Sequence, residues 1–168
     1  MEWLPFDLHP EYPREGIAID DLSRRYGHDV RASQARMFDE AGLPHAPRGF
    51  VPNSHPALNT AELARERGVH EALHPRLMAA YWAEARDIGD PDVLVAEGAA
   101  VGLDPDEIRD VIATGRHEDR IAASTAAVLE MGAGGVPAWV VDDRLLIPGA
   151  QPHELFERVL VKLGHGGE

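Results

Sequence analysis

The chain has 168 residues, of which 44% are hydrophobic and 27% charged, a composition typical of a globular domain with its own core. Its 16 basic and 29 acidic residues give a formal net charge of −13, which disfavours binding to nucleic acid or to an anionic membrane. With no cysteine, its own side chains offer neither a disulfide nor a thiolate metal site. No apolar run approaches the length of a membrane span, and the acidic, proline-rich start does not resemble a secretory signal, so we expect a cytoplasmic protein.

The N-terminal residues predict one short strand followed by helices. Glu2–Phe6 is a strand candidate because of its aromatic content, and Pro10 lies beyond its end. A helix is then expected to start at Asp20 or Asp21, either of which can cap it, and to end at Gly27.

A second helix is predicted over Arg31–Ala41, with Met37 and Phe38 facing inward and Gly42 as its stop. The next segment, Leu43–Ser54, contains prolines and a glycine, and we expect it to be a loop.

Proline, aspartate and glycine signals predict further helices in the middle of the chain. They start at or beside Pro56, Pro75, Asp90-Pro91, Asp104-Pro105 and Glu118. An aspartate followed by proline supplies a capping oxygen and a first-turn residue that needs no hydrogen-bond acceptor. The helix expected from Pro75 carries Tyr81 and Trp82 on its apolar stripe, so both rings are predicted to lie in the core.

The C-terminal region predicts a β-hairpin followed by a helix. The apolar runs Ala138–Val141 and Leu145–Ile147 are joined at Asp142-Asp143, and aspartate tolerates the positive φ that a type I′ turn requires. Pro152 opens the last helix. Apolar residues at helical spacing predict that this helix packs on the hairpin; they are Leu155, Phe156, Val159, Leu160 and Leu163.

The order of these elements predicts a helical domain over 17–131, inserted into a small α/β core made of 1–12 and 132–168. The segment GVPAWVVDDRLLIPGAQPHELF resembles the end of the thioredoxin-like fold in the DsbA family, in its FrnE-type branch. The start, EWLPFDLHPEYPREG, and the stretches ALNTAELARERG, LMAAYWAEARDIGDPDVL and AVGLDPDEI are also similar to that branch. The fold class expected is α/β, an incomplete thioredoxin-like core with a large all-helical insertion.

The resemblance implies an oxidoreductase family whose first strand, Cys-x-x-Cys motif and following helix would lie before Met1. Because the chain has no cysteine, we expect it to be redox-inactive by itself, with no catalytic residue, cofactor or metal of its own. The alternative function is a non-catalytic module for binding or scaffolding. In either case a core without its first strand is expected to leave open sheet edges, and a homodimer is the predicted way to cover them.

The resemblance also implies a binding cleft beside a cis Val136-Pro137 bond, which pairs through its main chain with a peptide or a small thiol ligand. The candidate ligand-binding residues are Val136, Pro137, Ala138, Ala150, Gln151, Phe6 and Asn53. For Gln151 a second reading stays open, in which its side chain only caps the last helix.

Two groups of histidines call for other interpretations. His70-Glu71-Ala72-Leu73-His74 has the letters of a zinc-protease motif, which requires one continuous helix. Because Pro75 disfavours the α conformation at the residue before it, we expect a break there, with His74 capping the next helix. His45 and His55 flank the proline-rich loop, where they either contact a ligand or are simply solvated.

Overall fold

The computed structural model describes residues 2–165 and divides into two compact units, Met1–Ala123 and Ser124–Glu168. We describe each unit by itself. The helix α7, Glu118–Glu130, runs across the boundary between them and confirms the last helix predicted before the hairpin. The sequence predicts a different division, in which a helical domain over 17–131 is inserted into a split α/β core. The two compact units do not test this division, and it stays a prediction.

The first residues of the helical unit form an extended segment without strand pairing, so the strand predicted over Glu2–Phe6 is wrong. The segment is held by side chains instead. The ring of Trp3 stacks on His74 with the centroids 4.5 Å apart, and the guanidinium of Arg65 donates to the Trp3 carbonyl. A strand needs a neighbouring backbone to pair with, and no described strand lies alongside this segment.

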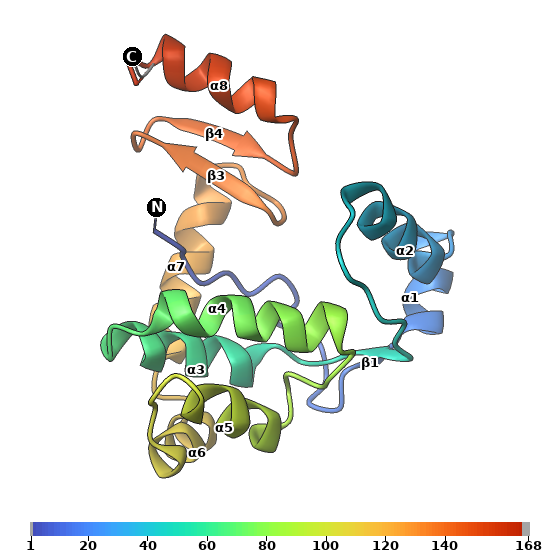
Figure 1. Ribbon diagram of the computed structural model, residues 1–168, viewed down its shortest axis with the longest axis vertical. Helices are drawn as coiled ribbons and strands as arrows, with labels where there is room; N and C mark the ends of the chain where they lie inside the picture. The colour runs from blue at the N-terminus through green and yellow to red at the C-terminus, as the bar shows by residue number, and fades with distance from the viewer. Residues whose placement is uncertain (1, 166–168) are drawn as a thin grey trace. The chain divides into compact units, whose positions relative to one another are not determined.

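A helical hairpin follows and is enclosed by a short antiparallel ladder. The strand β1, Ile17–Ala18, pairs with β2, Phe50–Val51, so the segment predicted as loop over 43–54 contains one short strand. The helix α1, Ile19–Tyr26, and the helix α2, Val30–Ala41, lie between the two strands in sequence (Figure 1).

The ends of these helices were predicted better than their starts. Gly27 and Gly42 both terminate a helix with positive φ, as expected. The N-cap of α1 is Ala18, however, so Asp20 and Asp21 lie in the first turn. There their negative charges interact favourably with the helix dipole, but they do not cap the helix.

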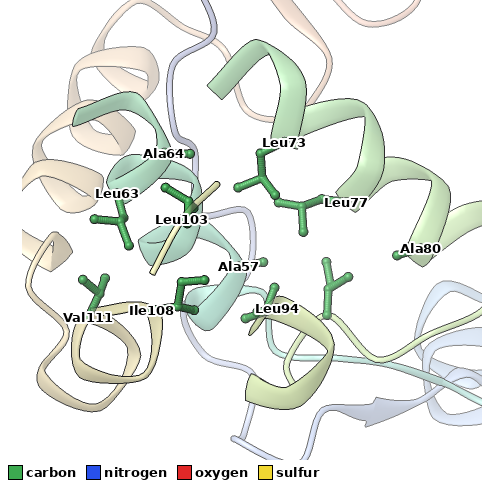
Figure 2. Packing of buried hydrophobic residues seen from close by; sticks show 11 residues of the cluster. Ala57, Leu63, Ala64, Leu73, Leu77, Ala80, Leu94, Leu103, Ile108 and Val111 are labelled. Atoms are coloured by element: carbon green, nitrogen blue, oxygen red, sulfur yellow. The ribbon is translucent and has the colours of Figure 1, made fainter. Parts of the chain in front are cut away.

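Four helices pack into the main core of this unit. They are α3, His55–Glu66; α4, His70–Met78; α5, Pro91–Ala99; and α6, Pro105–Thr114. Figure 2 shows Leu63, Leu73, Leu94 and Ile108, one from each helix, pointing toward one another, and each is fully buried. Burial of such aliphatic side chains, worth about 1.5–3 kcal/mol each, is the main stabilising contribution here.

The helix α4 does not break at its proline. Pro75 lies inside α4, so the helix predicted to start there begins five residues earlier, at His70. The expectation that His74 caps a new helix is therefore wrong. The chain continues from α4 into a π-helical turn, η1, Ala79–Ala83, and then leaves the helix at Ala85, whose φ is +53°.

Aspartate caps start the next two helices as predicted. The carboxylate of Asp90 accepts from the Asp92 N–H, and that of Asp104 accepts from the N–H groups of Asp106 and Glu107.

The second unit contains the predicted hairpin and closing helix. The strand β3, Ala138–Val141, pairs antiparallel with β4, Leu145–Pro148, and Trp139 lies opposite Ile147. The helix α8, His153–Lys162, covers one face, with Phe156 packed edge-on against the Trp139 ring at 5.3 Å (Figure 1).

The turn of the hairpin has the predicted geometry. Asp142 and Asp143 have φ values of +54° and +53°, and the Arg144 N–H donates to the Val141 carbonyl at 3.2 Å. The imidazole of His165 contacts both carboxylate oxygens of Asp142, at 2.9 and 2.8 Å, and so ties the end of the described chain to the turn.

Candidate functional site in the hairpin unit

The approach to β3 is an exposed, glycine-rich segment that ends in a cis Val136-Pro137 peptide bond. The side chain of Val136 is 55% exposed, although it is apolar. The Pro137 carbonyl accepts a hydrogen bond of 2.8 Å from the Gly149 N–H, which fastens the start of β3 to the end of β4. Val136, Pro137 and Ala138 therefore lie at the end of the hairpin farthest from its turn.

The hydrogen bonds at the two ends of β3 show which of its main-chain groups pair with β4 and which face away from it. The carbonyls of Pro137 and Val141 both accept from the β4 side. Main-chain groups alternate between the two edges of a strand, so the N–H and C=O of Ala138 and Val140 point away from β4. No other described strand pairs with β3. This edge therefore presents donors and acceptors at the spacing of an extended peptide.

Gln151 and Ala150 lie at the same end of the hairpin as Pro137. The Gln151 amide donates to the Pro148 carbonyl at 2.8 Å and closes the turn between β4 and α8. Its side chain makes no capping bond to α8, so the reading of Gln151 as a helix cap is not what the structure shows. Ala150 is exposed beside it.

The two remaining candidates belong to the helical unit. Asn53 donates to the Tyr12 carbonyl at 2.9 Å, and its side-chain oxygen accepts from the His55 N–H at 2.9 Å, so both ends of its amide hold the loop in place. Phe6 is half-buried between the buried residues Pro5 and Asp7. The structure thus gathers Val136, Pro137, Ala138, Ala150 and Gln151 within one unit, and gives Asn53 a loop-stabilising role in the other.

Sequence reasoning missed a contact between a buried acid and a partly exposed imidazole in the helical unit. Asp7 is only 7% exposed, and its carboxylate lies 2.5 Å from Nε2 of His55, the first residue of α3. No spacing signal links two residues so far apart in sequence. Of the two loop histidines, His55 is therefore engaged by protein, and His45 packs against the ring of Phe38 at 5.1 Å.

The histidines of the zinc-like motif share one face of α4 but form no metal site. Their rings stack at 5.6 Å, and burial lowers the pKa of both His70 and His74. Within residues 2–165, no group of three or more His, Asp or Glu side chains is placed to hold a metal ion. A catalytic zinc site needs three protein ligands, so the zinc-hydrolase reading has no support in this geometry.

No helix among the described residues is long and apolar enough to cross a bilayer.

Comparisons with known proteins agree with this architecture. The model of the DSBA-like thioredoxin domain matches residues 1–161. The uncharacterized protein YwbO of Bacillus subtilis is 25% identical over 167 residues, which cover 95% of this chain and 80% of YwbO.

Two solved structures resemble the chain. That of the probable DsbA oxidoreductase SCO1869 of Streptomyces coelicolor matches with a TM-score of 0.86 and 27% identity over 97% of this chain and 74% of SCO1869. A Nitrosomonas europaea protein that carries the name protein disulfide isomerase matches with a TM-score of 0.69 and 17% identity, over 93% and 80% of the two chains, and supports the fold. The fold is thus the expected helix-rich, α/β thioredoxin-like one, and the chain belongs to the family of DSBA-like thioredoxin domains.

Proposed function

We propose that this chain is a recognition module of the DsbA-like thiol-disulfide oxidoreductase family, which binds an extended peptide along the open edge of β3 and does not itself transfer electrons. The observation that carries the proposal is the outward direction of the main-chain groups of Ala138 and Val140. A peptide laid along this edge adds a third strand, and main-chain hydrogen bonds supply the affinity without any thiol.

The absence of cysteine supports the redox-inactive part of the proposal. Thiol-disulfide exchange proceeds by attack of a thiolate on a disulfide sulfur, and none of the 168 residues can supply that thiolate. In an insulin-reduction assay with dithiothreitol, the protein should leave the rate of precipitation at the uncatalysed level. Measurable turnover would contradict this part of the proposal and leave the peptide site untouched.

The peptide site is tested by replacing Val140 with proline. Val140→Pro removes one outward N–H but leaves the ladder to β4 intact, and proline is tolerated on such an edge. The probe is a fluorescein-labelled peptide of alternating valine and threonine, measured by fluorescence anisotropy. We expect the variant to bind at least about tenfold more weakly, the effect of losing one hydrogen bond and its strand register.

Two controls separate main-chain recognition from loss of side-chain contacts. Val140→Ala keeps the N–H and should bind nearly as well as the wild type. A probe N-methylated at every residue has no N–H group on either edge and should not bind, whereas a probe methylated at every second residue keeps one edge that can pair with β3. Undiminished binding of the fully methylated probe would rule out strand addition.

The proposed setting is the cytoplasm, as expected from the sequence, and the FrnE-type branch is the proposed position within the family. Cell fractionation with an antibody against the protein tests the first of these statements.

A further inference from the structure

Arg48 is a buried cation without a counter-ion in the helical unit. It lies between α2 and β2 and is only 8% exposed. Its Nε, Nη1 and Nη2 atoms are all buried, and no carboxylate among the described residues accepts a hydrogen bond from them; the Tyr81 side chain interacts with the guanidinium but carries no charge to balance it. Buried charges are ordinarily paired, because an unpaired one loses its hydration and receives nothing in return.

Other buried charges of this acidic chain follow that rule. Arg76 and Arg86 both contact the buried carboxylate of Glu97, at 2.8 and 2.5 Å, and Arg65 contacts buried Glu62 at 3.1 Å. Acidic side chains outnumber basic ones by 29 to 16, yet none is paired with Arg48 among residues 2–165. The missing partner is therefore a local feature and does not reflect a shortage of acids.

Two aromatic rings pack against one side of the guanidinium. Its central carbon lies 3.5 Å from the ring centroid of Tyr81 and 4.5 Å from that of Trp82. Both residues come from η1, and π-helical turns occur frequently at functional sites. The two ring centroids are themselves only 4.7 Å apart, so both rings lie on the same side of the guanidinium and leave its other side to a different partner. Burial also lowers the pKa of Arg48, which an anion beside it would reverse.

The surrounding contacts hold this arrangement in place. The Ala46 N–H donates to the Trp82 carbonyl at 2.9 Å, and Nε of Arg31 donates to the Arg48 carbonyl at 3.3 Å. Phe38 of α2 packs on Trp82 with the ring centroids 4.7 Å apart. The segment that carries Arg48 is thus fastened to η1 on one side and to α2 on the other.

We propose that Arg48, Tyr81 and Trp82 form a binding site for the carboxylate group of a small organic acid or of a peptide C-terminus. A carboxylate is planar and matches two N–H donors of a guanidinium side by side, on the side that Tyr81 and Trp82 leave uncovered. It reaches them when the segment 43–47 moves away from η1, which breaks the hydrogen bond between Ala46 and Trp82.

The test measures binding of sodium benzoate to the full chain. The indole N–H resonance of Trp82, assigned with Trp82→Phe, is followed during the titration at constant ionic strength set with chloride. We expect a saturable shift of this resonance in the wild type. In Arg48→Met we expect at least about tenfold weaker binding, because a charge-assisted pair is lost. Arg36→Met, a change at an exposed arginine of α2, should retain the wild-type response.

Thermal denaturation without ligand distinguishes a binding role from a structural one. If Arg48 lacks a partner in the free protein, its replacement by an apolar side chain of similar length leaves the melting temperature unchanged or raises it. A Trp82 resonance that does not respond to benzoate, or an equal response in Arg48→Met, would overturn the proposal. So would a lower melting temperature of Arg48→Met in the absence of ligand.

The source of the carboxylate is decided by further probes. An acetylated tripeptide with a free C-terminus and the same peptide as its amide differ only in the carboxylate. If the free peptide binds more tightly than benzoate and the amide does not bind, the site takes a peptide C-terminus. If benzoate binds more tightly than the free peptide, the site takes a small acid. Binding of sulfate as tight as that of benzoate would refute the planar-carboxylate assignment.

Discussion

His70 and His74 show how the surroundings of single residues set a pH dependence. Burial lowers the pKa of both imidazoles from the usual 6.5, and Trp3 stacks on the second ring. In the unfolded chain both histidines titrate near 6.5. As pH falls below 6.5, the unfolded chain binds protons that the folded protein does not, so their contribution to stability is present above this pH and is lost below it.

We therefore expect the free energy of unfolding to decrease between pH 7.5 and 5.5 more steeply in the wild type than in His70→Gln/His74→Gln. Urea unfolding at several pH values measures the difference. His153→Gln is the matched control, because His153 is exposed on α8, and it should keep the wild-type slope. A double variant with an unchanged slope would show that these imidazoles do not govern the dependence.

At the same scale, the sequence predicts residues that act through their immediate neighbours and misses those that act across the fold. Gly42 and Asp104 were predicted correctly because helix caps are local. Met37 was expected to face inward but is 55% exposed, since the helical pattern of α2 does not reveal how little covers it. The Asp7–His55 pair and the stacking of Arg48 on Tyr81 depend on tertiary packing, which no local pattern encodes.

At the scale of elements, the close packing of α5 on α6 depends on one glycine. A Cβ built on Gly98 would lie 2.5 Å from Cδ1 of Ile108, a fully buried side chain of α6. We expect Gly98→Ala to lower the free energy of unfolding by about 1–3 kcal/mol, because overpacking outweighs the gain in helix propensity. Urea denaturation followed by circular dichroism measures the change.

Gly49→Ala is the control for this substitution within the same unit. A Cβ at Gly49 meets nothing within 4 Å, so the change should have little effect on stability. If Gly98→Ala were as stable as the wild type, Ile108 would have room to move and the two helices would not be packed as described.

Element boundaries were predicted where turn chemistry is explicit and missed where tertiary contacts override it. The Asp142-Asp143 turn and the Pro152 helix start appear as expected. Pro75, in contrast, stays inside α4, because Leu73 and Leu77 on either side of it are both buried in the core, and this packing offsets the lost hydrogen bond. The segment Glu2–Phe6 has strand-forming residues but no strand beside it, so its composition alone was misleading.

At the scale of the whole molecule, the open edge of β3 leads us to expect self-association. Apolar side chains of the hairpin, of the segment before it and of α8 are exposed; they include Val136, Val140, Leu145, Leu160 and Val161. A second copy can pair its own β3 edge across a two-fold axis and cover part of this surface. Sedimentation velocity at micromolar concentration should give twice the chain mass of 18.3 kDa.

The same edge cannot serve a partner copy and a peptide at once. Addition of the valine–threonine probe should therefore shift the protein toward the monomer, and Val140→Pro should be monomeric without it. A wild-type protein that sediments as a monomer at every concentration would contradict the homodimer and would leave peptide binding to be judged by anisotropy.

The π-helical turn η1 has an evolutionary consequence. A π-turn is an α-helix that has accepted one extra residue, and each residue of an α-helix turns the direction of the side chains by about 100°. Deleting one alanine from Ala79–Ala83 would restore regular winding and rotate Tyr81 and Trp82 relative to Arg48 without changing any of the three. Relatives that lack one residue of this turn would thus keep the arginine, tyrosine and tryptophan of the cluster but lose the contacts between them. Near-ultraviolet circular dichroism of the deletion variant would show the rotation.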